Sequence, residues 1–135
     1  MLIKSKKVWS NGQFLPLILE VEDKKITAVY DYDAFDKVDY DFGTNRVLPG
    51  FIDVHTHGAY GYDTNDVNEE GLRNWTKNVV SEGVTSFLPT TITQTEEVLL
   101  KAVANVAKVY EEGYEGAEIL GIHFEGPYLD VDKRG

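Results

Sequence analysis

The chain has 135 residues, of which 42% are hydrophobic and 12% aromatic, a composition typical of an ordinary globular domain with enough apolar side chain for a core. Its formal net charge of -10 argues against nucleic acid or an anionic membrane surface as the main partner, because a phosphate backbone binds clustered lysine and arginine. The absence of cysteine excludes disulfides, thiolate metal sites and a cysteine nucleophile, so any metal ion must be held by histidine, carboxylate or water.

The lengths of the apolar segments indicate in which part of the cell the protein is located. Residues 1–7 lack the long apolar segment of a signal peptide, and no stretch approaches the ~20 apolar residues that a membrane-spanning helix needs. We therefore expect a soluble cytoplasmic protein with no membrane partner.

Residues 1–48 predict a small antiparallel β module that forms the N-terminal part of a small β domain. Strand-like runs at 2–9, 14–22 and 26–30 are separated by short turn-forming segments. The first of these turns contains Asn-Gly, which between alternating segments is a strong hairpin signal. Residues 38–42 are compatible with one more strand.

Residues 49–135 change to an alternation of strands and helices, which favours parallel βαβ units with right-handed crossovers and an α/β fold class. Strands are expected at 48–55, 84–89 and 119–124. The first strand is apolar on both sides, as in a strand that is covered on both faces.

Two amphipathic helices are expected between these strands. The first follows Asn68 as its N-cap and ends at Gly83, and the second follows Thr93, which forms a capping box with Glu96, and ends at Gly113. Apolar residues recur at helical spacing in both helices and predict the buried faces. They are Leu72, Trp75 and Val79 in the first helix and Leu99, Val103, Val106 and Tyr110 in the second.

Three residues with metal-binding side chains fall at the carboxyl ends of the predicted parallel strands. His55 and His57 are two positions apart, so in an extended strand their imidazoles project from the same face. Glu125 follows the third strand, and the carboxyl ends of parallel strands meet at one edge of the sheet. Two imidazoles and a carboxylate suit Zn²⁺, Fe²⁺ or Mn²⁺, so we predict that these three residues bind a divalent metal.

Other interpretations of these residues remain open. A His-x-His pair occurs in solvated loops, and Glu125 could serve as a salt-bridge partner or a helix cap. His123 is compatible with a packed group behind the ligands or with a ligand. Asp53 lies one step deeper than His55, which favours a hydrogen-bonding role over metal contact.

Three motifs carry a family resemblance. Residues 49–58, Pro-Gly-Phe-Ile-Asp-Val-His-Thr-His-Gly, resemble the first-strand signature of the amidohydrolase superfamily, whose members are metal-dependent hydrolases built on a (β/α)₈ barrel with a small β domain. Residues 85–93 and 118–128 are similar to segments of one family within it, the N-acetylglucosamine-6-phosphate deacetylases. All three motifs occur in the expected order along the chain.

This resemblance implies an activity and its cofactor. The expected reaction is hydrolysis of the acetamide of N-acetylglucosamine 6-phosphate, a small amino-sugar phosphate, to acetate and glucosamine 6-phosphate. It also implies that Glu125 is a metal ligand, and that His55 and His57 hold a second metal ion as in the two-metal members of the family. A homodimer is implied for the full-length enzyme to which the chain would belong, which we call the parent enzyme.

The resemblance further implies that the chain is an N-terminal fragment. In the family, the remaining metal-binding histidines, the catalytic aspartate and the phosphate-binding residues follow the Glu-Gly-Pro motif, and this sequence ends at Gly135. A (β/α)₈ barrel usually needs ~250 residues, so three strands predict an incomplete TIM-like barrel. We therefore expect no catalytic residue in the 135-residue chain and no activity from it alone. Another amidohydrolase, such as a cyclic amidase, and a truncated non-catalytic metal-binding module are the alternatives.

Overall fold

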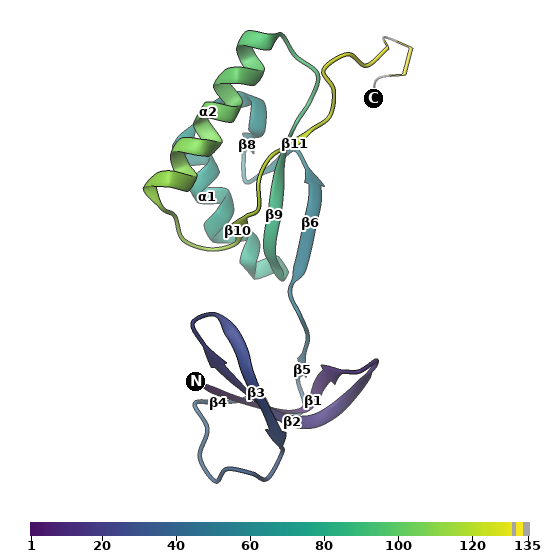
Figure 1. Cartoon of the computed structure of the whole chain (residues 1–135), viewed down its shortest axis with the longest axis vertical. Coiled ribbons are helices and arrows are strands. Elements are labelled where there is room, and N and C mark those ends of the chain that lie inside the picture. Colours follow the sequence, from purple (N-terminus) through teal and green to yellow (C-terminus); the bar gives the residue numbers. More distant parts are fainter. Residues whose placement is uncertain (131, 134–135) are drawn as a thin grey trace. The chain divides into compact units, whose positions relative to one another are not determined.

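The protein has a mixed α/β fold and separates into two compact units, Met1–Pro49 and Gly50–Gly135 (Figure 1). The computed structural model describes residues 1–130, 132 and 133. No helix within these residues is long and apolar enough to cross a membrane.

The first unit is a five-stranded sheet. Its strands are β1 (Leu2–Ser10), β2 (Gln13–Glu22), β3 (Lys25–Asp31), β4 (Tyr40–Asp41) and β5 (Arg46–Val47). The first three form antiparallel hairpins, as the sequence predicts. The turn between β1 and β2 places Asn11 and Gly12 at φ values of 49° and 81°, the left-handed conformation that Asn-Gly hairpin turns require.

The sheet of this unit is mixed, so the prediction of a purely antiparallel module is wrong. Both β4 and β5 pair with β1 in parallel, through Ile3 with Tyr40 and Val8 with Val47. After β3 the chain returns through residues 32–39 to the start of β1, where the Asp39 amide donates to the Leu2 carbonyl at 3.1 Å. Strand direction depends on this return path, which strand periodicity does not encode.

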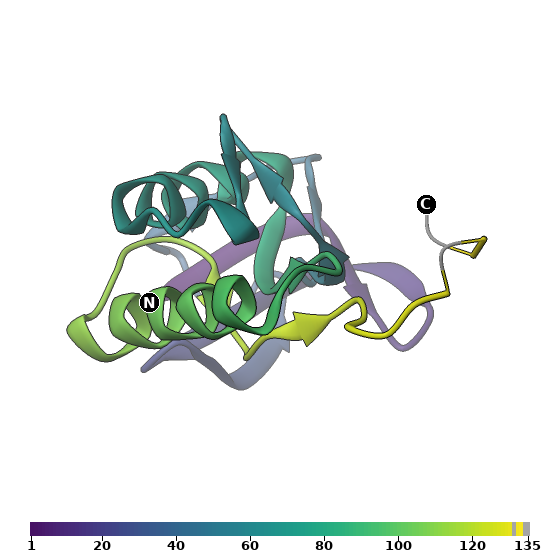
Figure 2. The ribbon, with the colours of Figure 1, turned by 90° about the horizontal axis from the view of Figure 1, so that it is seen from above.

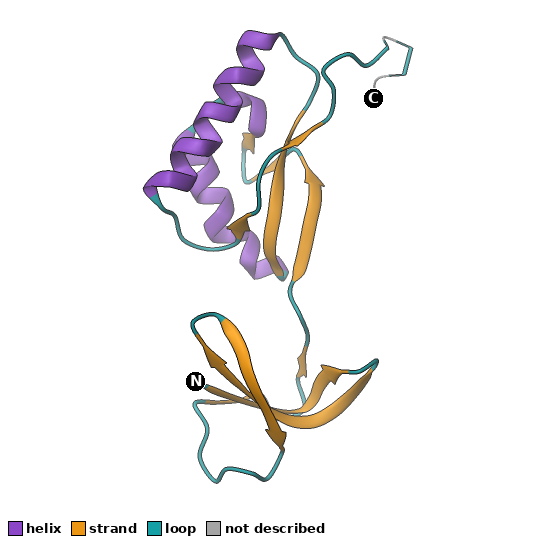
Figure 3. Ribbon diagram, in the orientation of Figure 1, coloured by secondary structure: helices purple, strands orange, loops and turns teal. Residues whose placement is uncertain are grey.

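The second unit packs two α-helices against a parallel sheet. Its elements are β6 (Phe51–Thr56), β7 (Gly58–Ala59), β8 (Tyr62–Asp63), the 3₁₀ helix η1 (Thr64–Asp66), α1 (Glu69–Val79), the 3₁₀ helix η2 (Val80–Glu82), β9 (Val84–Thr91), α2 (Glu96–Glu112), β10 (Glu118–Ile119) and β11 (His123–Phe124). The central strand is β9, with which β6, β10 and β11 all pair in parallel. Figures 2 and 3 show that α1 and α2 lie on the same side of β9.

The third predicted strand is interrupted. Instead of one strand over 119–124, the chain forms the short β10 and β11, which pair with the first and second halves of β9. Between them Gly121 adopts a φ of 151°, and the chain leaves the ladder after the Leu120 amide donates to the Phe87 carbonyl at 3.0 Å. An apolar run alone does not report such a break.

The first predicted strand is not covered on both faces. Phe51, Ile52 and Val54 of β6 are 69%, 61% and 57% exposed. The cause is the one-sided helical layer, together with the edge position of β6, which within the described residues pairs with β9 alone. β6 therefore carries more apolar side chains than the described part of the chain buries.

The core of the second unit lies between α1, α2 and β9. Leu72, Trp75 and Val79 are buried, which confirms the predicted face of the first helix. The Trp75 and Phe87 rings lie 4.6 Å apart between centroids. The predicted N-cap is also confirmed, because the Asn68 side chain accepts a hydrogen bond from the Gly71 amide at 3.2 Å.

The second helix differs from its prediction at both its cap and its buried face. The N-cap is Thr95, whose hydroxyl accepts from the Val98 amide at 3.4 Å, and Thr93 lies outside the helix. The buried face includes Leu99 and Val106, as predicted, but it continues through Ala102 and Val109. Tyr110, which was predicted to be buried, is 58% exposed because Val109 takes the place next to the sheet.

We expect Thr95→Ala to lower the free energy of unfolding by about 1 kcal/mol, because the substitution leaves a helix-terminal amide without its side-chain acceptor. Urea unfolding followed by far-ultraviolet circular dichroism measures this change. Thr95→Ser keeps the acceptor and is the matched control, expected to lie near the wild type. A wild-type stability for Thr95→Ala would contradict the assigned cap.

Candidate metal centre

The three predicted ligands meet at the carboxyl ends of the parallel strands. His55 lies in β6, His57 follows β6, and Glu125 follows β11. The Glu125 Oε2 atom lies 2.8 Å from His55 Nε2 and 3.2 Å from His57 Nε2. One ligand atom from each residue lies within 4.8 Å of the other two, although Glu125 is 70 positions after His55. The structure thus brings together residues that the sequence grouped by strand position.

His57 is oriented by the backbone of the neighbouring strand. Its Nδ1 atom lies 3.2 Å from the carbonyl oxygen of Thr90, and a carbonyl only accepts, so Nδ1 carries the proton and donates. The Nε2 atom is then the ring nitrogen that faces Glu125, at 3.2 Å from its Oε2 atom. Thr90 is fully buried, which makes its carbonyl a rigid anchor.

Glu125 is held at both of its backbone polar groups. Its amide donates to the Thr91 carbonyl at 3.1 Å, and its carbonyl accepts from the Thr93 hydroxyl at 3.2 Å. A Cβ atom on the next residue, Gly126, would lie 2.1 Å from that hydroxyl, so glycine is required there for the close approach. Sequence reasoning assigned Thr93 to a helix cap and missed this contact.

The charge state of Glu125 suits a metal ligand. The hydrogen bond with His55 lowers the pKa of the Glu125 carboxyl below its ordinary value, and the charge of His57 acts in the same direction against partial desolvation. The carboxyl is therefore ionised at neutral pH. A carboxylate oxygen and two imidazole nitrogens form a common ligand set for divalent metals.

The spacing of these atoms also fits a divalent ion. Ligand atoms about 2.0–2.2 Å from a tetrahedral zinc ion lie roughly 3.4 Å from one another. The nitrogen–oxygen separations of 2.8 and 3.2 Å at Glu125 need only a small outward adjustment to reach that value. Three protein ligands also leave a coordination position for water, as hydrolytic zinc sites do.

His123 and Asp53 lie beside the three residues and contact the backbone of β6. The Nδ1 atom of His123 lies 3.0 Å from the Val54 carbonyl, and its ring centroid lies 4.5 Å from that of His55. The Oδ1 atom of Asp53 accepts from the His55 amide at 3.1 Å.

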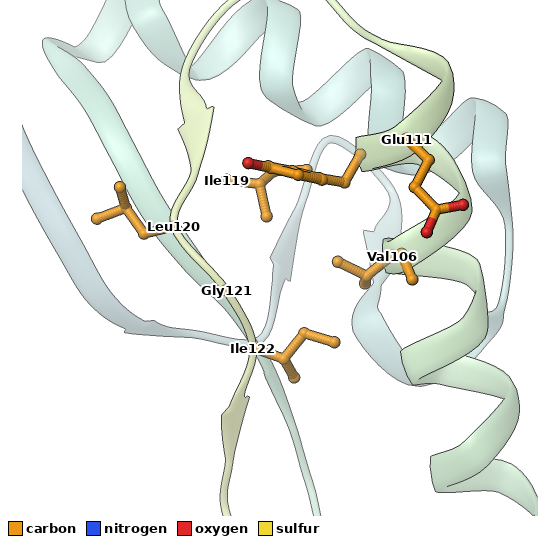
Figure 4. Close-up of a pocket in the computed structure, with 8 residues that line it drawn as sticks. Val106, Glu111, Ile119, Leu120, Gly121 and Ile122 are labelled. Carbon is orange, nitrogen blue, oxygen red and sulfur yellow. The ribbon is translucent and has the colours of Figure 1, made fainter.

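A separate apolar groove of about 390 Å³ lies between α2 and the segment that joins β10 to β11 (Figure 4). Its lining includes Val106, Ile119 and Ile122, with Glu111 at one side. None of the three predicted ligands, His55, His57 and Glu125, lines this groove. The candidate metal centre is therefore an open site at the strand ends and not part of this groove.

Comparison with known proteins gives this geometry a family context. Residues 46–134 match the amidohydrolase family. The N-acetylglucosamine-6-phosphate deacetylase of Vibrio furnissii is 36% identical over 115 residues, which cover 84% of this chain and 29% of the relative. The Homo sapiens protein of the same name is 40% identical over 98 residues, covering 70% of this chain and 24% of the relative. The chain spans between 23% and 30% of the length of these curated relatives.

Solved structures agree with the sequence matches. A variant of N-acetyl-D-glucosamine-6-phosphate deacetylase from Mycobacterium smegmatis, in complex with N-acetyl-D-glucosamine-6-phosphate, aligns with a TM-score of 0.86 at 27% identity, covering 100% of this chain and 35% of that one. The Pasteurella multocida enzyme gives 0.82 at 28% identity, covering 98% and 36%. The resemblance drawn from the three motifs is thereby confirmed. The chain belongs to the amidohydrolase family.

Proposed function

We propose that the chain is part of a metal-dependent amide hydrolase that converts N-acetylglucosamine 6-phosphate to glucosamine 6-phosphate and acetate. The observation that carries the proposal is the convergence of His55, His57 and Glu125 at one sheet edge, in a chain whose relatives are named for this deacetylation. The parent protein is the enzyme in this proposal.

The proposal includes the architecture of the parent. Residues 1–48 belong to its small β domain, and residues 49–135 supply the first strands of a (β/α)₈ barrel. Three positions around that barrel are filled by β6, β9 and the pair β10 and β11, which are parallel neighbours here. The exposed apolar side chains of β6 are consistent with a strand that gains further neighbours in the parent.

The proposed centre holds divalent metal through His55, His57 and Glu125, with Zn, Fe or Mn as the ion and two metal sites in the parent enzyme. Bound metal would supply a water of lowered pKa and polarise the amide carbonyl. The contribution of this chain is positional: Thr90 fixes the His57 tautomer, and Thr93 fixes the backbone that carries Glu125. We assign no catalytic acid or base among the described residues and propose that an aspartate elsewhere in the parent has that role. A cytoplasmic homodimer is also part of the proposal.

A chimeric enzyme tests the function. We expect full deacetylation of N-acetylglucosamine 6-phosphate when these 135 residues replace the matching segment of the Vibrio furnissii relative, measured as glucosamine 6-phosphate released. Glu125→Ala in the chimera is expected to lower kcat/KM about 100-fold or more, because it removes a metal ligand. The 135-residue chain alone, loaded with Zn²⁺, is expected to give no turnover.

The controls separate the alternatives. Glu97→Ala changes an exposed carboxylate on α2 and is expected to leave the activity of the chimera unchanged. A chimera that hydrolyses a cyclic amide and leaves the acetylated sugar intact would favour a cyclic amidase. Robust turnover by the isolated chain would overturn the proposed inactivity.

A further inference from the structure

We propose that His123 is a positioning residue that fixes the orientation of His55 through the peptide bond between Val54 and His55, and so sets the metal affinity of the centre. This inference rests on the proposed function of the site. It assigns His123 a role through the backbone and not as a ligand.

The path of β6 is irregular at the point where His55 emerges. Asp53 pairs with Phe87 of β9 and Thr56 pairs with Pro89, so β6 advances three residues while β9 advances two. One residue is therefore extra on β6, which is a β-bulge. Bulges next to active sites re-aim a side chain, and they release backbone groups from the regular ladder. Such a segment needs other contacts to hold a single conformation.

Two side chains supply those contacts to one peptide unit. The His123 Nδ1–H donates to the Val54 carbonyl at 3.0 Å, and the His55 amide donates to Asp53 Oδ1 at 3.1 Å. These are the carbonyl and the amide of the same peptide bond. Because that bond is planar, fixing both groups fixes its plane and restricts the direction in which the Cα–Cβ bond of His55 leaves the backbone.

The ring of His123 adds a contact to the side chain itself. It packs edge-on against the His55 ring, with centroids 4.5 Å apart and planes at 74°. His123 does not belong to the group of ligand atoms that lie within 4.8 Å of one another. Both of its ring nitrogens lie outside that group, so the geometry separates this histidine from the three ligands.

Three substitutions test the role of the N–H group. His123→Phe keeps a ring against His55 but removes the donor, and His123→Asn keeps a donor at the position of Nδ1. His123→Gln places its amide at the position of Nε2. We expect Co²⁺ affinity to fall roughly 10- to 100-fold in the Phe and Gln variants and to stay within about 3-fold of the wild type in the Asn variant.

The measurement is competition for Co²⁺ with a chromophoric chelator, using the full 135-residue chain, together with the visible absorption of bound Co²⁺. A changed spectrum in His123→Phe and a wild-type spectrum in His123→Asn are expected, because the spectrum reports ligand geometry and a merely structural loss would not be rescued by Asn. Wild-type affinity in His123→Phe, or in His123→Gln if the Phe variant does not fold, would overturn the inference. So would an Asn variant as weak as Phe. A wild-type chain that binds no Co²⁺ is a different result, and it would overturn the proposed metal centre itself.

Discussion

Simultaneous replacement of His55, His57 and Glu125 by alanine is expected to abolish divalent-metal binding by the chain. The three side chains provide the cluster of imidazole nitrogens and carboxylate oxygen at the strand ends, and no other group of three such ligands occurs among residues 1–130, 132 and 133. Equilibrium dialysis against Zn²⁺ followed by elemental analysis measures the loss. We expect bound zinc to fall from near one equivalent to background, a change of about 1,000-fold or more in affinity.

A triple variant of exposed carboxylates controls for a general change in surface charge. Glu96, Glu97 and Glu118 are exposed and lie outside the cluster, so their replacement by alanine is expected to leave zinc binding intact. Zinc that survives the first triple substitution in a folded chain would show that the metal site lies elsewhere. Circular dichroism of both variants establishes that the comparison is made between folded proteins.

Trp75→Ala is expected to have the largest effect on stability. Trp75 is 1% exposed, packs against Phe87, and lies near Tyr62 with ring centroids 6.0 Å apart. Truncating a buried tryptophan removes apolar contacts and leaves a cavity, which costs about 3–5 kcal/mol. This is a large part of the roughly 5–15 kcal/mol by which domains are stable, so the second unit is expected to unfold at a clearly lower urea concentration.

Trp9→Ala is the natural control, because Trp9 is 42% exposed and belongs to the first unit. It is expected to leave the urea midpoint of the helical signal near 222 nm unchanged, whereas Trp75→Ala lowers that midpoint. Equal midpoints for the two variants would show that Trp75 does not anchor the core.

The candidate site was largely predictable because its signals are local. Two histidines two positions apart in an extended segment project from the same face, and a carboxylate after a later parallel strand lies at the same edge of the sheet. Both statements depend on short segments and on the direction of the strands. The geometry around His55, His57 and Glu125 follows from them.

The features that were predicted wrongly depend on long-range contacts. Thr93 and Thr95 both precede the second helix at a spacing that suits an N-cap. The Thr93 hydroxyl instead donates to the distant Glu125 carbonyl, and the Thr95 hydroxyl caps the helix. The parallel pairing of β4 with β1 and the break at Gly121 likewise follow from how segments pack, which single-sequence periodicity does not report.

The last residues of β9 and those just after it form hydrogen bonds to ligand residues that are far apart in the chain. The Thr90 carbonyl holds His57, while the Thr91 carbonyl and the Thr93 hydroxyl hold the backbone of Glu125. A cation that binds only when these ligands are assembled favours conformations in which this segment is intact, by about 4 kcal/mol at a free concentration 1,000 times its dissociation constant. Metal binding and local unfolding at the end of β9 are therefore opposing equilibria, and the ion would slow amide hydrogen exchange at residues that it does not touch.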